Sequence, residues 1–248
     1  MTDMKKILPL AALVLLASAC THFRTQVFED DLVIPLADPP TDTLFYTASL
    51  EYVTGGATIP VQEKINTTIL SQAFDLEEGL AGTLEETAVR YRENLIDEFL
   101  NENENRDFGP GSWEDRIDGS FTGNYKNWCN YLLTYYSYRG GAHGIQTVSN
   151  IVFDRKSGET LTEKDLFQEG YAPAIAALLQ ESVTESFRKE APELLELVDL
   201  PSVIPNGNFS VGGGGVEWTF QPYEVGPYAL GIITAGATWE QLKPYLKK

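Results

Sequence analysis

The chain has 248 residues, of which 43% are hydrophobic and 22% are charged, proportions that are ordinary for a folded globular protein. Its 18 basic and 36 acidic residues give a formal net charge of −18. This charge argues against nucleic acid and anionic membrane surfaces as partners, because both would repel the chain. It favours a cationic protein partner, although an acidic surface also keeps an exported protein soluble without one.

Residues 1–19 have the parts of a bacterial lipoprotein signal peptide. Lys5 and Lys6 precede an apolar run over 7–16, and small residues lead up to Cys20. The run is too short to span a bilayer, and the small residues before the cysteine resemble a lipobox, although Ala17 stands where Leu is commoner. We predict that Cys20 is acylated, for example with palmitate, and anchors the mature chain to the lipid bilayer.

Residues 20–43 are predicted to be a tether, because Pro35, Pro39 and Pro40 interrupt them and no periodicity is sustained. The segment begins Thr-His-Phe-Arg after Cys20, without an immediate acidic run. This favours the outer membrane, with the protein facing the periplasm. The alternative is an ordinary secretory signal peptide whose first mature residue happens to be Cys.

Residues 44–127 are predicted to form an N-terminal α+β subdomain. A strand is expected over 44–53, and Thr58 with Pro60 begins a helix. Thr83 and Glu86 form a capping box before a second helix, and a polar loop follows at 101–111. Each helix has an apolar stripe expected to face the core: Val61, Ile65, Ile69 and Ala73 in the first, and Leu84, Ala88, Tyr91, Leu95 and Phe99 in the second.

Three consecutive strands are predicted in the middle of the chain, over 116–122, 128–138 and 146–154. Short turns join them, so the strands should pair antiparallel. The strand over 128–138 is apolar on both faces. It should therefore be central in its sheet and covered on both sides, unless one face meets a partner.

Residues 128–248 are predicted to form the C-terminal α+β subdomain. Pro173 begins a helix with a core-facing stripe, 212–215 is a hairpin loop, 216–220 is a strand, and Thr238 caps a last helix. The predicted fold is therefore α+β, with antiparallel sheets, helices packed on one face, and two subdomains that meet near residues 112–128.

The most informative stretch is 135–144, Tyr-Tyr-Ser-Tyr-Arg-Gly-Gly-Ala-His-Gly. An aromatic strand runs into a loop in which Gly140, Gly141 and Gly144 surround His143. Glycine is used where the backbone takes φ > 0 or passes close to another group. We therefore expect the loop to be fixed by its backbone, with Gly141 as a position where a side chain would fit badly if its φ is positive.

A second motif follows at 216–231, where a strand leads into Pro-Tyr-Glu-Val-Gly-Pro-Tyr-Ala-Leu-Gly over 222–231. Together with the turn at 154–159 and the segment 161–167, the two motifs resemble the extracytoplasmic domain family shared by the anti-sigma factor RsiV and the peptidoglycan deacetylase PdaC. The resemblance covers about residues 130–246, and the residues from about 45 look like the usual companion of this domain.

The resemblance implies an α+β fold and an extracytoplasmic location. The sensor branch of the family contacts lysozyme, so the implied ligand is a lysozyme-like protein or a cell-wall glycan. The catalytic deacetylase domain of PdaC is not matched, and its activity is therefore not implied.

The sequence offers little material for catalysis, and we assign no catalytic residue, metal or cofactor. Its two histidines are His22 and His143; no zinc-binding motif and no Gly-x-Ser-x-Gly is present. Asp154 and Asp165 stand beside turns and helix starts, where carboxylates usually accept backbone N–H bonds. A lone Cys129 is expected to be a small buried hydrophobe. The alternative function is a cell-wall glycan hydrolase using His143 and a carboxylate.

We predict instead a binding surface where the two motifs come together. Its residues share a rigid or aromatic character with nearby charge, as at interface hot spots: Tyr138, Arg139, His143, Tyr223, Glu224 and Tyr228. The alternative for the tyrosines of the second motif is that they only lock the final strand to the core.

Overall fold

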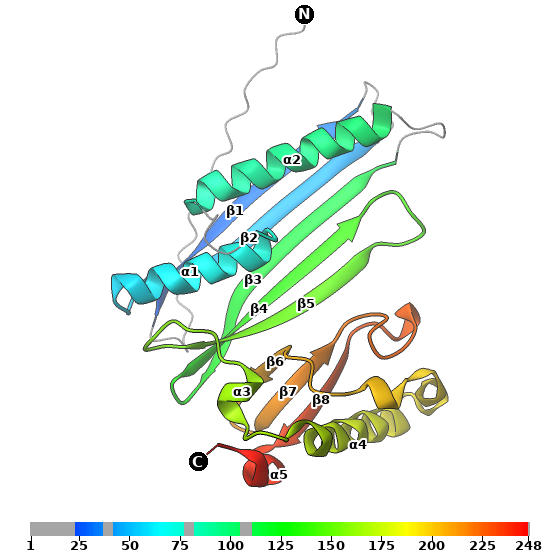
Figure 1. Ribbon diagram of the computed structural model, residues 1–248. Coiled ribbons are helices and arrows are strands. Elements are labelled where there is room, and N and C mark those ends of the chain that lie inside the picture. Colours follow the sequence, from blue (N-terminus) through cyan, green and yellow to red (C-terminus); the bar gives the residue numbers. More distant parts are fainter. Residues whose placement is uncertain (1–22, 37–41, 77–81, 105–110, 248) are drawn as a thin grey trace, which may run out of the picture.

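A computed structural model describes residues 23–36, 42–76, 82–104 and 111–247. The predicted signal peptide and Cys20 lie outside these residues. The described chain forms two β-sheets, each with helices packed against it (Figure 1). This confirms the predicted α+β class.

The first sheet has five strands in the order β1-β2-β3-β4-β5. Their bounds are β1 Arg24–Pro35, β2 Thr43–Gly55, β3 Trp113–Tyr125, β4 Trp128–Tyr138 and β5 Ile145–Asp154. The three strands predicted in the middle of the chain pair antiparallel, as expected. β2 and β3 pair parallel, because two helices lie between them in the chain and parallel neighbours need such a crossover.

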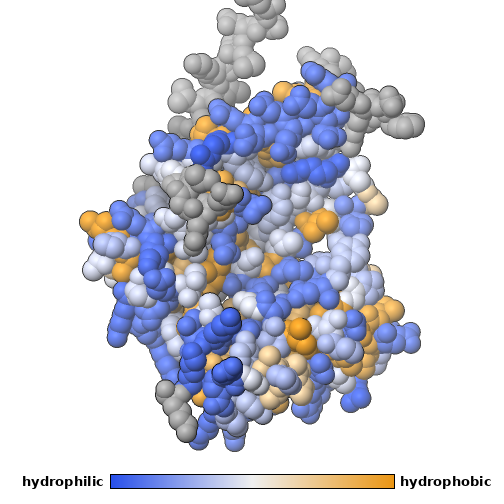
Figure 2. Space-filling model, in the orientation of Figure 1, coloured by the Kyte–Doolittle hydropathy of each residue, from blue (hydrophilic) through white to orange (hydrophobic). Residues whose placement is uncertain are grey.

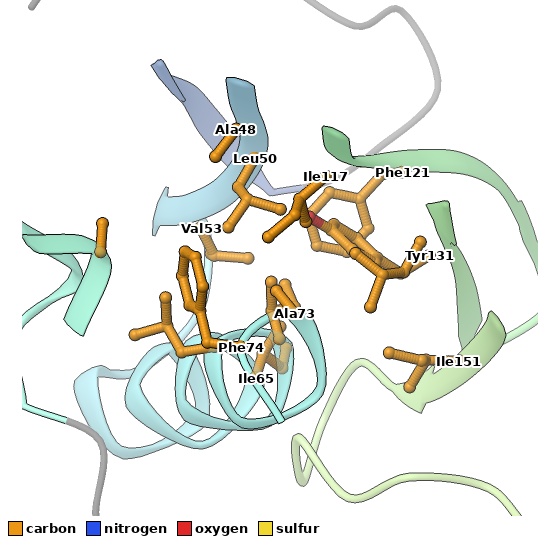
Figure 3. Packing of buried hydrophobic residues seen from close by; sticks show 14 of the residues in the cluster. Ala48, Leu50, Val53, Ile65, Ala73, Phe74, Ile117, Phe121, Tyr131 and Ile151 are labelled. Carbon is orange, nitrogen blue, oxygen red and sulfur yellow. The ribbon is translucent and has the colours of Figure 1, made fainter. Parts of the chain in front are cut away.

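Those helices, α1 (Ile59–Ala73) and α2 (Leu84–Glu104), lie on one face of the first sheet (Figure 1). The predicted stripe of α1 is buried along its whole length, and Ile65 and Ala73 point toward Ile117 and Tyr131 of the sheet (Figure 3). The capping box of α2 is present, since Thr83 N–H donates to Glu86 and Glu86 N–H donates to Thr83 Oγ1. The outer side of α2 is largely hydrophilic (Figure 2).

The second sheet has the order β6-β7-β8 and lies beside the lower end of the first (Figure 1). Its strands are β6 Phe209–Val211, β7 Gly215–Phe220 and β8 Ile233–Thr238, with α3 Glu163–Leu166, α4 Ala172–Glu190 and α5 Trp239–Leu242 around them. Short 3₁₀ turns occupy Pro192–Leu197, Leu200–Ser202, Tyr228–Leu230 and Lys243–Tyr245. α4 supplies Ile175, Leu179 and Val183 to a second hydrophobic cluster around the fully buried Trp218. Within the described ranges, none of the helices combines the length and the apolar character needed to cross a bilayer.

The predicted tether at 20–43 is wrong over half of its length, because Arg24–Pro35 forms the edge strand β1 and pairs antiparallel with β2. Phe28, Leu32 and Ile34 of this strand pack against the first core. Asp30 lies on the same face of the strand as these three residues, so it interrupts the alternation of apolar and polar residues that would have indicated a strand. Its carboxylate is buried and paired with Arg92 of α2, so a charge occupies an inward position of the strand.

The predicted boundary between the subdomains at 127/128 is also displaced. β4 and β5 belong to the first sheet, and the hydrophobic cluster of that sheet extends to Phe153. The chain therefore enters the second unit after β5. β4 is central, as predicted, with Tyr131 fully buried on its inner face. On its other face, Trp128 packs against the second cluster, while Tyr136 and Tyr138 are half-buried.

Side-chain amides join the two sheets at the free edge of β5. Gln221 accepts a hydrogen bond from Val148 N–H (3.0 Å) and donates one to Val148 C=O (2.6 Å). Asn208 accepts from Asn150 N–H (2.7 Å) and donates to Val148 C=O (2.8 Å). We call these contacts the amide clasp. They satisfy edge backbone groups that would otherwise lack a strand partner.

A reciprocal amide contact runs in the other direction. Asn130 of β4 donates to Val211 C=O (2.8 Å) and accepts from Val211 N–H (2.9 Å) at the edge of β6. Each sheet therefore completes the edge of the other, and this junction fixes the segment after β7 relative to the loop after β4.

Candidate functional site

The loop over 140–144 connects β4 to β5, and its glycines have different roles. Gly140 has φ 74°, in the left-handed region. Gly144 has no room for a side chain, since a Cβ there would lie 2.5 Å from Cε2 of Tyr136. Gly141, which we expected to be the restricted position, faces open space and is not among the residues with positive φ. The loop is held at Gly140 and Gly144 instead.

The two sequence motifs meet at His143. Its imidazole stacks on the ring of Tyr228, with a centroid distance of 4.0 Å and an interplanar angle of 20°. Tyr228 Oη donates a hydrogen bond to Gly144 C=O (2.8 Å), and His143 Nδ1 lies 3.0 Å from the same oxygen. The carbonyl oxygen has lone pairs for two such donors. The glycine loop and the second motif are thus fixed to each other.

Tyr223 extends this stack to the surface. Its ring centroid lies 5.6 Å from that of Tyr228, with a tilt of 36°, and 61% of Tyr223 is exposed. Its backbone has φ 71°, a conformation that costs a non-glycine residue on the order of 1–3 kcal/mol and is found mainly where the surroundings enforce it. We call His143, Tyr223 and Tyr228 the aromatic corner.

Glu224 helps to enforce that conformation. Its carboxylate accepts hydrogen bonds from Gln221 N–H (2.7 Å) and from Asn206 Nδ2 (2.7 Å), while Glu224 N–H donates to Gln221 C=O (3.0 Å). Gln221 and Asn206 belong to the network of amides at the junction. The corner therefore rests on the contact between the two sheets.

Arg139 is not part of the aromatic corner, and its side chain contacts buried residues of the first sheet. Its guanidinium forms a bidentate ion pair with the carboxylate of Asp115, which is fully buried. The guanidinium also lies 4.6 Å above the ring of Trp113. Tyr91 donates to the same carboxylate (2.9 Å). Burial and the carboxylate of Asp115 raise the pKa of the Tyr91 hydroxyl, so this hydroxyl stays protonated as a donor.

Tyr138 is likewise tied back, because its hydroxyl donates to Gly141 C=O (3.0 Å). Of the six predicted binding residues, the structure therefore brings together His143, Tyr223 and Tyr228, with Glu224 beside them in the chain. The side chain of Tyr138 bonds to the loop instead, and that of Arg139 bonds to Asp115 of β3.

A cleft of about 680 Å³ lies between β5 and the second unit. Glu224 is the one predicted residue that lines it. The other polar groups in the cleft are mostly bonded to one another: the carboxylate of Glu163, for example, accepts from Trp218 Nε1, Gly207 N–H and the Tyr171 hydroxyl. The cleft is therefore mainly the solvent-exposed side of the contacts between the two sheets.

The amides of that junction were missed by sequence reasoning. They come from three separate segments without a shared spacing, and only the fold brings them together: Asn150, Asn206 with Asn208, and Gln221. A usable signal was the run Asn206-Gly-Asn208 beside a strand, which is typical of side chains that replace backbone bonds.

The remaining titratable groups have structural roles. Asp154 accepts hydrogen bonds from the N–H groups of Lys156 and Ser157, and Asp165 accepts from Thr162 at the start of α3, as predicted for both. Cys129 is fully buried, and burial raises the pKa of its thiol to about 12, as expected for an inert side chain. Across the described residues, no group of three or more His, Cys, Asp or Glu is placed to hold a metal ion.

Two solved structures share this arrangement. One is a member of the DUF3298 family from Bacteroides fragilis, with a TM-score of 0.79 and 19% identity over 96% of this chain and 95% of that one. The other is a DUF3298 family protein from Pseudomonas aeruginosa, with a TM-score of 0.67 and 14% identity over 91% of this chain and 94% of that one. At these identities the likeness shows a common fold.

Residues 164–239 match the model of the family described as "Protein of unknown function (DUF3298)". The matched segment contains the second motif and ends at the start of α5; the glycine loop lies before it. No curated protein matches the chain. The resemblance to RsiV and PdaC stays a prediction.

Proposed function

We propose that this protein is a lipid-anchored binding module of the cell envelope, which recognises a protein or a cell-wall glycan through the aromatic corner. The observation that carries the proposal is Tyr223, a large ring that is 61% exposed and is held at φ 71° by bonded neighbours. Strain of this kind is retained where the surrounding structure enforces it, and it is concentrated at functional sites.

The corner also has the physical properties of a recognition surface. His143 and Tyr228 are locked by their stack and by Gly144, so they lose little conformational freedom when a ligand binds. Rigid aromatic side chains of this type dominate binding energy at protein interfaces. If Tyr223 served only to lock the final strand to the core, its ring would be buried.

The anchor and the location rest on the sequence. Lys5, Lys6 and the apolar run before Cys20 support export and acylation, and the absence of an acidic run after Cys20 supports the periplasmic face of the outer membrane. The net charge of −18 supports a cationic partner.

The alternative of a glycan hydrolase needs a carboxylate that acts together with His143. The contacts of this ring within the described chain are the stack on Tyr228 and the approach to Gly144 C=O. Neither contact orients an acid or activates water. We therefore favour binding.

The test compares capture of envelope components by the parent protein, by Tyr223→Ala and by Phe45→Ala. Phe45 is a matched control because it is an aromatic residue with 45% exposure on β2, inside the first sheet. We expect the Tyr223 variant to lose the captured component, while the Phe45 variant retains it and both keep the parental melting temperature. Equal capture by all three proteins would remove the corner from the proposal. Release of sugars from purified muropeptides by the parent would favour the hydrolase.

A further inference from the structure

The hydrogen bonds at the corner determine which groups it can offer to a ligand. Gly144 C=O is an acceptor, so the His143 Nδ1 that lies 3.0 Å away must carry a proton. In the neutral ring, Nε2 then holds the lone pair. The hydroxyl of Tyr228 donates its hydrogen bond to the same carbonyl. His143 is exposed, and its Nε2, which bonds to none of the residues that the structure describes, is an acceptor.

Tyr223 and Glu224 add further electron-rich groups. The exposed ring of Tyr223 presents an aromatic face, which attracts cations. Each oxygen of the Glu224 carboxylate accepts one hydrogen bond, Oε1 from Asn206 Nδ2 and Oε2 from Gln221 N–H. A carboxylate can accept about four, so lone pairs remain on an exposed residue.

We propose that the aromatic corner binds a guanidinium group, that is, an arginine side chain presented by a protein partner. The inference rests on the proposed function and selects a protein, rather than a cell-wall glycan, as the ligand. A guanidinium has five N–H donors and no acceptor, and it stacks on aromatic rings. It therefore complements a ring face, an imidazole lone pair and a carboxylate. The net charge of −18 adds long-range attraction.

A sugar fits this set of groups less well. Each sugar hydroxyl both donates and accepts, so a site that offers only acceptors leaves the hydroxyl lone pairs without a protein partner. At the corner, the donors of Tyr228 and of His143 Nδ1 are already bonded to Gly144. This excess of acceptors over donors favours a protein ligand that presents an arginine over a glycan ligand.

The first measurement is the tautomer of His143, read from the ¹⁵N shifts of its ring nitrogens in the full chain under conditions where the ring is neutral. His143→Gln assigns the signals, because His22 is the only other histidine. We expect the protonated shift at Nδ1 and the unprotonated shift at Nε2. A proton on Nε2 in the neutral ring would overturn the inference.

The second measurement titrates the protein with N-acetyl-argininamide and with its neutral isostere N-acetyl-citrullinamide, and follows the ring signals of His143 and Tyr223. We expect the arginine derivative to bind at least about tenfold more tightly, as a charge-dependent contact to an aromatic ring and a carboxylate implies. Tyr223→Leu and Glu224→Gln should each weaken it, while Phe45→Ala should not. Equal binding of the two compounds, or of neither, would overturn the inference.

Chitotriose is the third probe, and it separates this inference from the function on which it rests. If chitotriose shifts the same signals and the arginine derivative does not, the guanidinium assignment fails and the binding module stands with a glycan ligand. If no probe binds, the assignment fails, and capture by Tyr223→Ala against Phe45→Ala decides the binding function independently.

Discussion

At the scale of single residues, the glycine loop is restricted at one position by a neighbouring ring. A Cβ on Gly144 would meet the ring of Tyr136, whereas a Cβ on Gly141 would meet nothing within 4 Å. We predict that Gly144→Ala lowers the free energy of unfolding by about 1–3 kcal/mol, the usual cost of forcing extra volume into a packed site. Gly141→Ala should change it by less than about 0.5 kcal/mol. Urea melts measure both, and equal stability of the two variants would contradict the prediction.

Arg139 gives the second prediction at this scale. Removing its side chain leaves the buried carboxylate of Asp115 without its cation. Such a loss typically costs about 3–5 kcal/mol, so Arg139→Ala should strongly lower the midpoint of urea unfolding. Arg116→Ala is the matched control, since Arg116 pairs with Glu114 on the surface and exposed pairs contribute at most about 1 kcal/mol. A mild Arg139→Ala that lost ligand binding would return Arg139 to the binding surface.

The residues of the corner were predictable in kind but not in role. His143, Tyr223 and Tyr228 stand in two motifs whose glycines and prolines indicate fixed backbone, and the fold brings them together. Arg139 stands in the first of these motifs as well, directly before Gly140, so its local sequence does not separate it from the corner residues. Its partner Asp115 lies 24 positions earlier, on β3, and nothing local in the sequence indicates that this carboxylate is buried.

At the scale of elements, the amide clasp replaces strand pairing at the edge of β5. We predict that Asn208→Ala lowers the free energy of unfolding by about 1–3 kcal/mol, because Asn150 N–H loses its acceptor and Val148 C=O loses a donor. The urea dependence of tryptophan fluorescence reports this, since Trp218 lies in the second cluster and Trp128 packs against it.

Gln180→Ala provides the control for that prediction. Its amide makes one long hydrogen bond of 3.4 Å to Val203 C=O, and its removal should cost less than about 0.5 kcal/mol. The variants Asn208→Ala and Asn150→Ala should also be non-additive when combined, as expected for side chains that share a hydrogen bond. Additive effects would show that the clasp does not act as a unit.

Sequence reasoning located the elements with clear periodicity and missed those without it. The stripe of α1 and the capping box of α2 were sufficient to place both helices. β1 was missed because Asp30 is at an inward position, where the pattern calls for an apolar residue. β6 and β8 were missed because they are short or built from small residues, with Gly236 in the middle of β8. The partner of β2 depends on a crossover that no local pattern specifies.

At the scale of the whole molecule, the membrane anchor is the feature to test first. We predict that Cys20→Ser abolishes incorporation of a radioactive fatty acid, because the thiol is the acylation site. Cys129→Ser is the control, since Cys129 is the other cysteine and is fully buried. It should incorporate the label like the parent. Labelling of the Cys20 variant at the parental level would show that the chain is not a lipoprotein of this kind.

The strand β1 has a consequence for such an anchored protein. Phe23, just before β1, is already packed in the first core, so three peptide units separate it from Cys20. At a maximum of about 3.6 Å per residue, they reach roughly 11 Å, which is less than the width of the domain itself. An acylated protein would therefore hold its first sheet close to the lipid headgroups. Its ligand would have to come within one domain's height of the bilayer, and the supply of that ligand would depend on what diffuses there or is itself embedded in the same membrane.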